Sequence, residues 1–230
     1  MNILDIKDVY KIYNESEVEV HAVNGVNLAF EKGEFAAIVG PSGSGKTTLL
    51  NMIGGLDQPT SGEIIVNDTN IGELKPSNLI DFRMYNIGFV FQAYNLIPVL
   101  TAKENVEFIM HLQGRPKKER DERAKELLEA VGLGDRMDSR PSKMSGGQQQ
   151  RVAVARALAS KPKFVLADEP TANLDSKSTE TLLDIMEKLN KEEQVTFIFS
   201  THDQRVVRKA RRVITLEDGK VKEDSVAQKV

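Results

Sequence analysis

The sequence contains no cysteine, which excludes disulfide bonds and thiolate-zinc sites. It also lacks long apolar runs, because the stretches at 35–39 and 164–167 are far shorter than the roughly 18 residues that span a bilayer. The first residues, MNILDIKD, lack the basic segment and long apolar segment of a secretory signal. We therefore expect a chain that is not exported, that occupies a reducing compartment, and that meets a membrane only through a partner.

An excess of positive charge is absent as well. The formal net charge of −3 gives no overall attraction to nucleic acid. The locally basic stretch 115–125 holds six cations and three acids, with Glu119/Arg123 and Asp121/Lys125 four residues apart. This spacing is typical of a solvated helix face rather than of a binding patch.

A second basic stretch, RVVRKARR at 205–212, follows a helix start expected near Asp203. Cations late in a helix suit the helix dipole, and contact with anionic lipid headgroups is the alternative. We expect no nucleic-acid partner from either stretch.

The organisation of the chain predicts one α/β domain. Short β-rich runs alternate with helical stretches that begin near Gly45, Ser176 and Asp203, which is typical of a largely parallel sheet. Residues 1–35 and 62–67 are strand-rich without helices between them and predict a small antiparallel sheet on the flank. The predicted strands are 24–30, 35–39, 64–66, 87–91, 164–167, 195–200 and 213–216.

Residues 101–160 show only helical patterns. We expect a single domain over 1–230, in which 1–92 and 161–230 form the α/β core with its antiparallel β flank. Residues 93–160 then form an inserted helical subdomain.

A phosphate-binding loop is the clearest motif. The apolar strand FAAIV leads into GPSGSGKTT and then into the helical LLNMI, which matches G-x-x-x-x-G-K-[ST] in its strand–loop–helix context. Glycines let backbone N–H groups converge on phosphates, Lys46 adds charge against the β- and γ-phosphates, and the Thr47 hydroxyl can bind Mg²⁺. The predicted binding residues are Gly40, Ser42, Gly43, Ser44, Gly45, Lys46, Thr47 and Thr48.

The stretch FVLADE supplies the carboxylates that such a site needs. Four apolar residues predict a buried strand, and Asp168 at its C-terminal end is the expected second Mg²⁺ ligand. Glu169 can orient and deprotonate an attacking water, which predicts a hydrolase rather than a kinase. The Asn-Lys-x-Asp segment with which GTPases read guanine does not occur in the sequence.

A second anion cradle lies about a hundred residues later in the sequence. MSGGQQQR, at 144–151, places a serine and two glycines before an apolar helical run, as at a helix N-terminus that holds an anion. With the phosphate-binding loop at 40–48, the sequence thus has two candidate anion-binding segments, here called the two anion cradles, and a single nucleotide site does not explain both.

These motifs resemble, in order and over essentially the whole chain, those of the nucleotide-binding subunit of ABC transporters. GPSGSGKT resembles Walker A, FVFQ the Q-loop with Gln92, MSGGQ the signature, FVLADE Walker B, ANLD the D-loop with Asp175, and FSTHD the switch with His202. GLDQPTSGEI, GFVFQAYNLIPVLTAKENVE and ADEPTANLDS are most similar to the lipoprotein-release and macrolide-export type. Met144 departs from the usual leucine of the signature, and Asn173 from the frequent alanine of the D-loop.

The resemblance implies Mg²⁺-dependent ATP hydrolysis by a dimer. It assigns Gln92 to Mg²⁺ and the attacking water, His202 to the γ-phosphate, and Tyr13 to stacking on adenine, with Tyr10 as a competing candidate. It also implies that the signature residues bind the nucleotide of a second, head-to-tail copy, which makes the active unit a homodimer. These residues are Ser145, Gly146, Gly147 and Gln148.

The same resemblance implies integral membrane permease subunits as partners and a place on the cytoplasmic face of the membrane. A periplasmic or extracellular accessory protein is a further expected partner. AYNLIPVL, at 93–100, offers apolar residues for a partner to cover, and packing inside the helical subdomain is the alternative.

Two other functions stay open at this point. A soluble ABC-type ATPase that acts on DNA or ribosomes would carry a long coiled coil or two tandem cassettes, and the sequence has neither. An ABC ATPase that transmits force to a membrane partner without transport fits the sequence as well as an exporter does.

Overall fold

Two β-sheets organise the chain. The structure is a computed structural model that describes residues 2–14 and 19–226. The larger sheet has six strands in the order β10-β9-β3-β8-β7-β6, with β10 antiparallel to β9 and the other neighbours parallel. The smaller sheet has four antiparallel strands in the order β2-β1-β4-β5. The predicted α/β fold, with its largely parallel sheet and antiparallel flank, is confirmed.

The elements have the following bounds. The strands are β1 (Asn2–Tyr13), β2 (Val20–Glu31), β3 (Phe35–Val39), β4 (Ser61–Val66), β5 (Thr69–Asn70), β6 (Ile87–Val90), β7 (Phe164–Asp168), β8 (Thr196–Ser200), β9 (Arg212–Glu217) and β10 (Lys220–Val226). The helices are α1 (Lys46–Ile53), α2 (Pro76–Asn86), α3 (Ala102–Leu112), α4 (Lys117–Ala130), α5 (Gly146–Ala159), α6 (Ser176–Glu193) and α7 (Gln204–Lys209). Short 3₁₀ helices cover Ile71–Glu73, Gly134–Arg136 and Pro141–Lys143.

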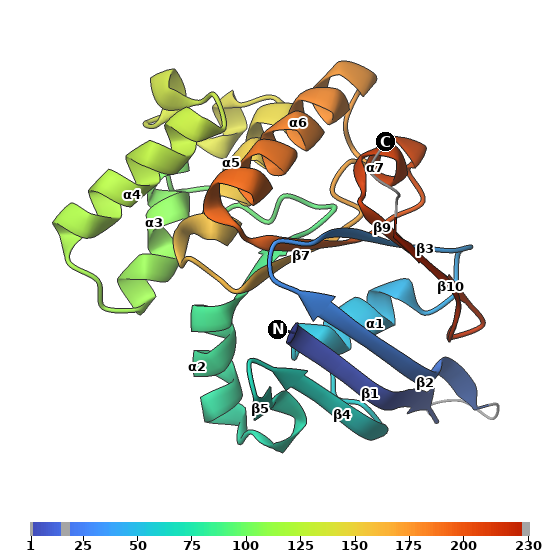
Figure 1. Ribbon diagram of the computed structural model, residues 1–230. Helices are drawn as coiled ribbons and strands as arrows, with labels where there is room; N and C mark the ends of the chain where they lie inside the picture. Colours follow the sequence, from blue (N-terminus) through green and yellow to red (C-terminus); the bar gives the residue numbers. More distant parts are fainter. Residues whose placement is uncertain (1, 15–18, 227–230) are drawn as a thin grey trace.

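The central strands are buried on both faces, since successive side chains of a strand point to opposite sides. In β3, Phe35 and Ala37 belong to the core that includes residues of α3 to α6. Ala36 and Ile38, by contrast, belong to the core that includes α1 and the small sheet. The large sheet is therefore a middle layer, with α3 to α6 on one side and α1 with the small sheet on the other (Figure 1).

All predicted strands occur, and α1, α6 and α7 begin within one residue of their predicted starts. Helix α2 was not predicted, because its apolar side is narrow: Leu79 and Phe82 pack against the core, but every residue of the helix is exposed or half-buried. Strand β10 was missed for a similar reason, since its sequence KVKEDSV is mostly polar and exposed. Within residues 2–14 and 19–226, no helix combines the length and apolar character needed to cross a membrane.

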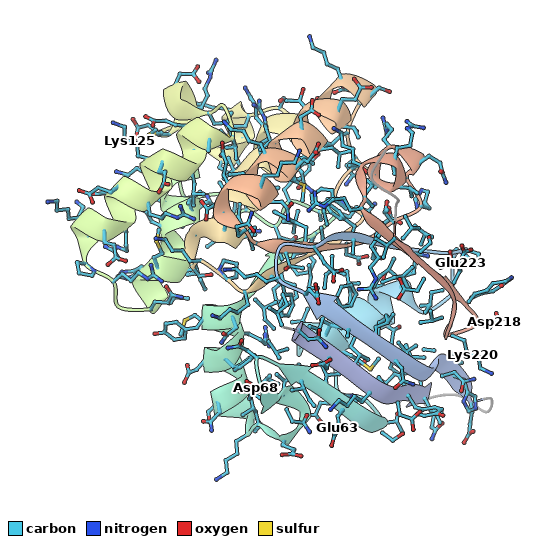
Figure 2. All side chains as sticks on the ribbon, viewed as in Figure 1. Glu63, Asp68, Lys125, Asp218, Lys220 and Glu223 are labelled. Atoms are coloured by element: carbon cyan, nitrogen blue, oxygen red, sulfur yellow. The ribbon has the colours of Figure 1, made fainter. Side chains whose placement is uncertain are left out.

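Some side chains of the basic stretch 115–125 pair with neighbouring helices instead of facing solvent. Asp121 pairs with Lys103 of α3 at 2.8 Å, and Arg123 is 7% exposed and pairs with Glu193 of α6 at 2.6 Å. Asp121 and Arg123 thus have partners on other helices instead of Lys125 and Glu119. Four-residue ion pairs typical of a solvated face do form along this stretch, and they are Arg115–Glu119, Lys118–Glu122 and Lys125–Glu129. Lys125 does extend from the outer side of α4, as Figure 2 shows.

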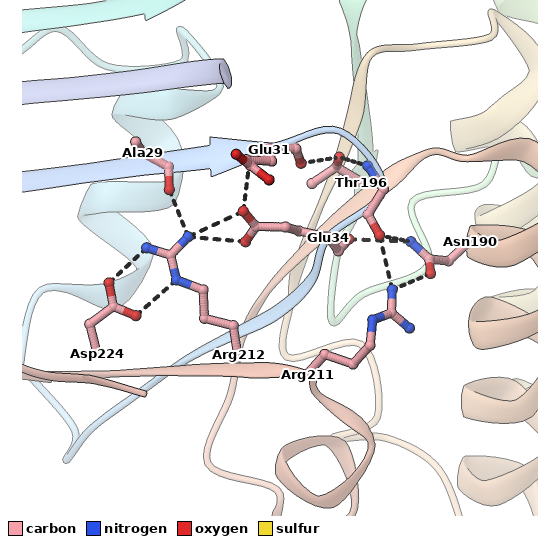
Figure 3. A network of polar contacts seen from close by, with 9 residues as sticks. Ala29, Glu31, Glu34, Asn190, Thr196, Arg211, Arg212 and Asp224 are labelled. Atoms are coloured by element: carbon pink, nitrogen blue, oxygen red, sulfur yellow. Dashed lines mark hydrogen bonds and ion pairs between the residues drawn. The ribbon is translucent and has the colours of Figure 1, made fainter. Parts of the chain in front are cut away.

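The second basic stretch is bound into the fold. Helix α7 ends at Lys209, so the last arginines lie beyond it, at the start of β9. Arg212 pairs with Asp224 at 2.7 Å and Glu34 at 3.0 Å, and Arg211 donates to the side-chain oxygen of Asn190 (Figure 3). These partners favour the structural interpretation of this stretch over contact with lipid headgroups.

Candidate active site

The phosphate-loop residues connect the carboxyl end of β3 to α1. Helix α1 begins at Lys46, and its N-cap Gly45 has no side chain with which to cap it, so the first backbone N–H groups can bind an anion. Gly45 has a φ of 96°, and a Cβ there would lie 2.1 Å from the Ala22 carbonyl oxygen. A Cβ on Gly40 would lie 2.1 Å from the Leu216 carbonyl oxygen. The loop therefore requires glycine at both positions.

Lys46 and Thr47, the first two residues of α1, direct their side chains to the phosphate loop and to Asp168, respectively. The Lys46 ammonium donates to the carbonyl oxygens of Gly40 and Pro41, both at 2.9 Å, which holds its charge against the loop. The Thr47 hydroxyl donates to Asp168 Oδ1 at 3.3 Å, although the two residues are 121 positions apart. A hydroxyl and a carboxylate at this distance fit Mg²⁺, which prefers oxygen ligands and takes the remainder from water and substrate phosphates. The described ranges contain no cluster of three or more His, Cys, Asp or Glu side chains that could hold a metal.

A cavity of about 830 Å³ lies over this loop, within the usual size of small-molecule sites. Ser44 is predicted to bind phosphate but does not line it, and within the described residues the buried Ser44 hydroxyl has no hydrogen-bond partner. The predicted site residues that line the cavity are Tyr13, Gly40, Ser42, Gly43, Gly45, Lys46, Thr47, Thr48, Gln92, Glu169 and His202. Val20, His21, Ala22, Pro41 and Ala172 also line it and were not predicted.

Glu169 directly follows β7 and lies between the loop and the switch. Its φ of 44° is unusual for a residue with a side chain, and such strained backbone is concentrated at functional sites. Its carboxylate contacts His202 Nδ1 at 2.7 Å and accepts from the Thr201 hydroxyl at 3.2 Å. The carboxylate is thus oriented at the cavity wall, where it can accept a proton from water.

Asp203 connects the switch to the segment after Glu169. Its carboxylate accepts from the Thr171 hydroxyl at 2.8 Å and from the Arg205 backbone N–H at 2.9 Å. Hydrogen bonds from the Arg205 side chain are the main cause that lowers the pKa of Asp203 from 3.8 to about 2. Because the folded pKa lies below the unfolded value, this contribution to stability is present above pH 3.8 and is lost as the pH falls toward 2.

Tyr13 rather than Tyr10 lines the cavity over the phosphate loop, which is called the nucleotide cavity below. The Tyr13 hydroxyl donates to Asp57 Oδ2 at 2.7 Å, and the Lys11 ammonium lies 4.8 Å from the ring centroid. The Tyr10 ring instead lies under Gly25, where a Cβ would be 2.9 Å from its hydroxyl oxygen. The structure therefore favours Tyr13 as the aromatic residue that a base would contact.

The signature begins α5 and does not reach the phosphate loop. Gln148 N donates to the Ser145 hydroxyl at 3.3 Å, while Ser145 N donates to the Gln148 side chain at 2.9 Å, which forms a capping box. Ser145, Gly147 and Gln148 line a second cavity of about 200 Å³. Of the residues that the structure describes, none lines both cavities.

Asp175, which is predicted to bind nucleotide, lines neither cavity, whereas cations that were not predicted line the second one. Asp175 caps α6 by accepting from Ser178 N at 2.9 Å, and Ser178 lines the cavity. Arg151 and Lys177 bring positive charge to the same cavity. Arg151 stands one helical turn after Gly147, a spacing that could have identified it from the sequence.

Comparisons with known proteins agree with these motifs. The family model described as "ABC transporter" matches residues 23–172. The macrolide export ATP-binding/permease protein MacB of Hyphomonas neptunium is 48% identical over 97% of this chain, which spans 34% of MacB. The lipoprotein-releasing system ATP-binding protein LolD 1 of Rhodopseudomonas palustris is 45% identical over 96% of this chain and 98% of its own length.

A solved structure supports the same assignment. The ATP-binding cassette MJ0796 of Methanocaldococcus jannaschii, in a dimeric post-hydrolysis state bound to ADP and Pi, has a TM-score of 0.89. It is 43% identical and covers 99% of this chain and 100% of its own. The chain therefore belongs to the ABC transporter family, as one of its ATP-binding and ATP-hydrolysing subunits.

Proposed function

We propose that two copies of this chain close head-to-tail on ATP and drive separate transmembrane subunits of a lipoprotein-release or macrolide-export type transporter. The observation that carries the proposal is the separation of the two anion cradles. The phosphate loop and the signature line different cavities, so one chain does not present both to the same triphosphate. In a two-fold dimer, each signature would meet the partner's phosphate loop. The dimeric state of MJ0796 supports this arrangement.

Within each composite site, the chain's own loop binds the phosphates. Lys46 would place its charge against the β- and γ-phosphate oxygens, as a charge-assisted hydrogen bond. Thr47 and Asp168, whose oxygens already lie 3.3 Å apart, would hold Mg²⁺, with Gln92 as a further ligand. Bound Mg²⁺ neutralises phosphate charge as it develops.

The catalytic step would then belong to Glu169. Its carboxylate would take a proton from the water that attacks the γ-phosphorus, while the bond from that phosphorus to the bridging oxygen breaks and ADP leaves. His202, whose Nδ1 contacts the carboxylate, would orient it and bind the γ-phosphate. Gln92 would help position the water. Tyr13 would stack on adenine from its place in the cavity wall.

The signature would complete the partner's site. The Ser145 hydroxyl oxygen accepts from Gln148 N, so its hydrogen remains available to donate to a phosphate. The N–H groups of Gly146 and Gly147, in the first turn of α5, point in the direction that suits an anion. The Gln148 side chain accepts from Ser145 N and so holds Ser145 in place, and Asp175 of the D-loop would contribute to nucleotide binding in the same composite site.

The membrane partners remain a proposal drawn from the relatives. The name of MacB combines ATP-binding and permease functions in a protein of which this chain spans 34%, and the name of LolD 1 places it in a lipoprotein-releasing system. We infer that permease subunits bind this chain at the cytoplasmic face of a membrane, with a periplasmic or extracellular accessory protein beyond them. The alternative of force transmission without transport would use the same surface.

The surface for that partner would include the segment after Gln92. Leu96 packs against the helical core, whereas Val99 is 71% exposed. Part of AYNLIPVL therefore packs inside the helical subdomain, and part of it is available to a partner. The C-terminal end of α3 contacts α2, where Gln113 donates to the Met84 carbonyl at 2.9 Å. Exposed apolar side chains on these two helices extend the surface, and they are Ile80, Tyr85, Phe108 and Leu112.

A pull-down from detergent-solubilised membranes tests this proposal. We expect the immobilised chain to retain an integral membrane protein with several predicted spans, identified by mass spectrometry. Val99→Asp is expected to reduce that recovery at least about tenfold, because a charge in a desolvated interface core is costly. The matched control is Val226→Asp, since Val226 is also 71% exposed but lies at the end of β10.

Equal recovery by both variants would place the docking surface elsewhere. Retention of ribosomal proteins or DNA, without any integral membrane protein, would contradict the transporter function itself.

A further inference from the structure

The backbone of the Q-loop is held by side chains from two other motifs. The segment between β6 and α3 contains neither helix nor strand, so its carbonyl groups need other partners. Asn173 Nδ2 donates to the Gln92 carbonyl at 3.1 Å, and Gln150 Nε2 donates to the Phe91 carbonyl at 3.1 Å. Arg156 donates to the Tyr94 carbonyl at 3.0 Å and also to the Asn95 carbonyl. Residues 91–95 of this segment are therefore held by α5 and the D-loop, whereas Asn105 of α3 binds the carbonyls of Ile97 and Leu100.

Asn173 makes this connection from within the D-loop. Its side chain binds the carbonyl of Gln92, while its own carbonyl accepts from the Tyr94 hydroxyl at 3.5 Å. The same hydroxyl lies against the signature, since a Cβ on Gly146 would be 2.5 Å from it. The Q-loop, the D-loop and the signature thus meet around Asn173 and Tyr94.

Gln150 of α5 also connects the Q-loop to the segment that follows Glu169. It is completely buried, and its amide also donates to the Pro170 carbonyl at 2.7 Å. Phe91 and Pro170 adjoin Gln92 and Glu169 in the sequence. One buried amide therefore fixes the distance between the backbones that carry these two residues.

We propose that Asn173 is a positioning residue for hydrolysis, which holds the Gln92 backbone so that the Gln92 side chain faces the nucleotide cavity. The proposal rests on the role of Gln92 proposed above. Alanine at this position cannot donate, so the D-loop would no longer hold the Q-loop. Asn173 does not line the nucleotide cavity, so its loss affects how Gln92 is placed rather than how ATP binds.

The test compares the kinetics of Asn173→Ala and Asn173→Asp. We expect kcat for ATP hydrolysis to fall about threefold to tenfold in both, which is the range for one hydrogen bond, while KM for ATP stays within about twofold. Asn173→Asp keeps the shape but replaces the donor with a carboxylate that repels the Gln92 carbonyl, so it should be at least as slow. The Mg²⁺ concentration for half-maximal activity should rise in both, since Gln92 is a proposed Mg²⁺ ligand. Asn78→Ala, an exposed asparagine on α2, is the control and should match the unmodified chain.

A double-mutant cycle with Gln92→Ala then separates the possible outcomes. If Asn173 acts through Gln92, Asn173→Ala should slow hydrolysis no further in the Gln92→Ala background. An equal fall in both backgrounds, or an unchanged kcat in Asn173→Asp with an unchanged thermal midpoint, overturns the inference and leaves the ATPase assignment intact. Failure of the proposed site would look different, because Gln92→Ala alone would then hydrolyse ATP at the full rate.

Discussion

Glu169→Gln is expected to lower the rate of ATP turnover at least about a hundredfold while ATP binding stays intact. Glutamine keeps the shape of the side chain and can still accept from the Thr201 hydroxyl, but its amide cannot take a proton from water. Steady-state phosphate release measures the turnover, and equilibrium titration measures the affinity. Glu192→Gln, at an exposed position late in α6, is the matched control and should hydrolyse normally.

The same variant reports on the dimer. Because hydrolysis would release the ATP that joins two chains, unhydrolysed ATP should hold Glu169→Gln as a dimer on a sizing column. Elution as a monomer with saturating Mg-ATP would mean that either the sandwich arrangement or the role of Glu169 is wrong.

Lys46→Ala is expected to weaken ATP binding about tenfold to a hundredfold, the range for a hydrogen bond to a charged group, and to reduce turnover with it. The substitution removes the ammonium that the Gly40 and Pro41 carbonyls hold against the loop. Calorimetric titration with ATP measures the affinity, and a thermal unfolding curve confirms that the variant is folded. Lys161→Ala is the control, because Lys161 precedes the amino end of β7, whereas the phosphate loop follows the carboxyl end of the parallel strand β3.

Unchanged affinity together with unchanged turnover in Lys46→Ala would count against the phosphate loop as the working site. A loss of affinity in Lys161→Ala of the same size would indicate that general charge, rather than the loop, governs binding.

Local sequence predicted the parts of the site that depend on neighbouring residues. The phosphate loop needs glycine, lysine and threonine in one register between a strand and a helix, and 40–48 shows all of this without tertiary information. The predicted convergence of Thr47 and Asp168 on one Mg²⁺ depended on two motifs that are each recognisable from local sequence, and the structure places their oxygens 3.3 Å apart although the residues are 121 positions apart.

Other parts depend on contacts between distant segments and carry no local signal. Ala22 reaches the cavity because β2 passes over the phosphate loop, where its carbonyl excludes a Cβ on Gly45. Arg123 lies in a stretch with the composition of a solvated helix face, yet its side chain is buried because α4 packs close to Glu193 of α6. Asn173 stands out in the sequence only as a departure from the family pattern, and its contact with Gln92 joins residues 81 positions apart.

The phosphate loop and the signature lie apart within one chain. Ser145 lines a cavity that shares no described residue with the cavity around Lys46. If the signature serves a neighbouring chain, a defect in one cradle and a defect in the other can be combined in a dimer that retains one intact composite site.

The most direct measurement of this claim is ATP occlusion by a crossed mixture of Lys46→Ala and Ser145→Arg, both carrying Glu169→Gln to stop turnover. Ser145→Arg should block the signature, because an arginine side chain would fill much of the cavity of about 200 Å³. Each variant alone should fail to occlude ATP, whereas the equal mixture should occlude up to one ATP per dimer. Mixtures of each variant with the Glu169→Gln chain are the controls for closure with one intact site. Occlusion by both controls but not by the crossed mixture would contradict a signature that acts on the partner's nucleotide.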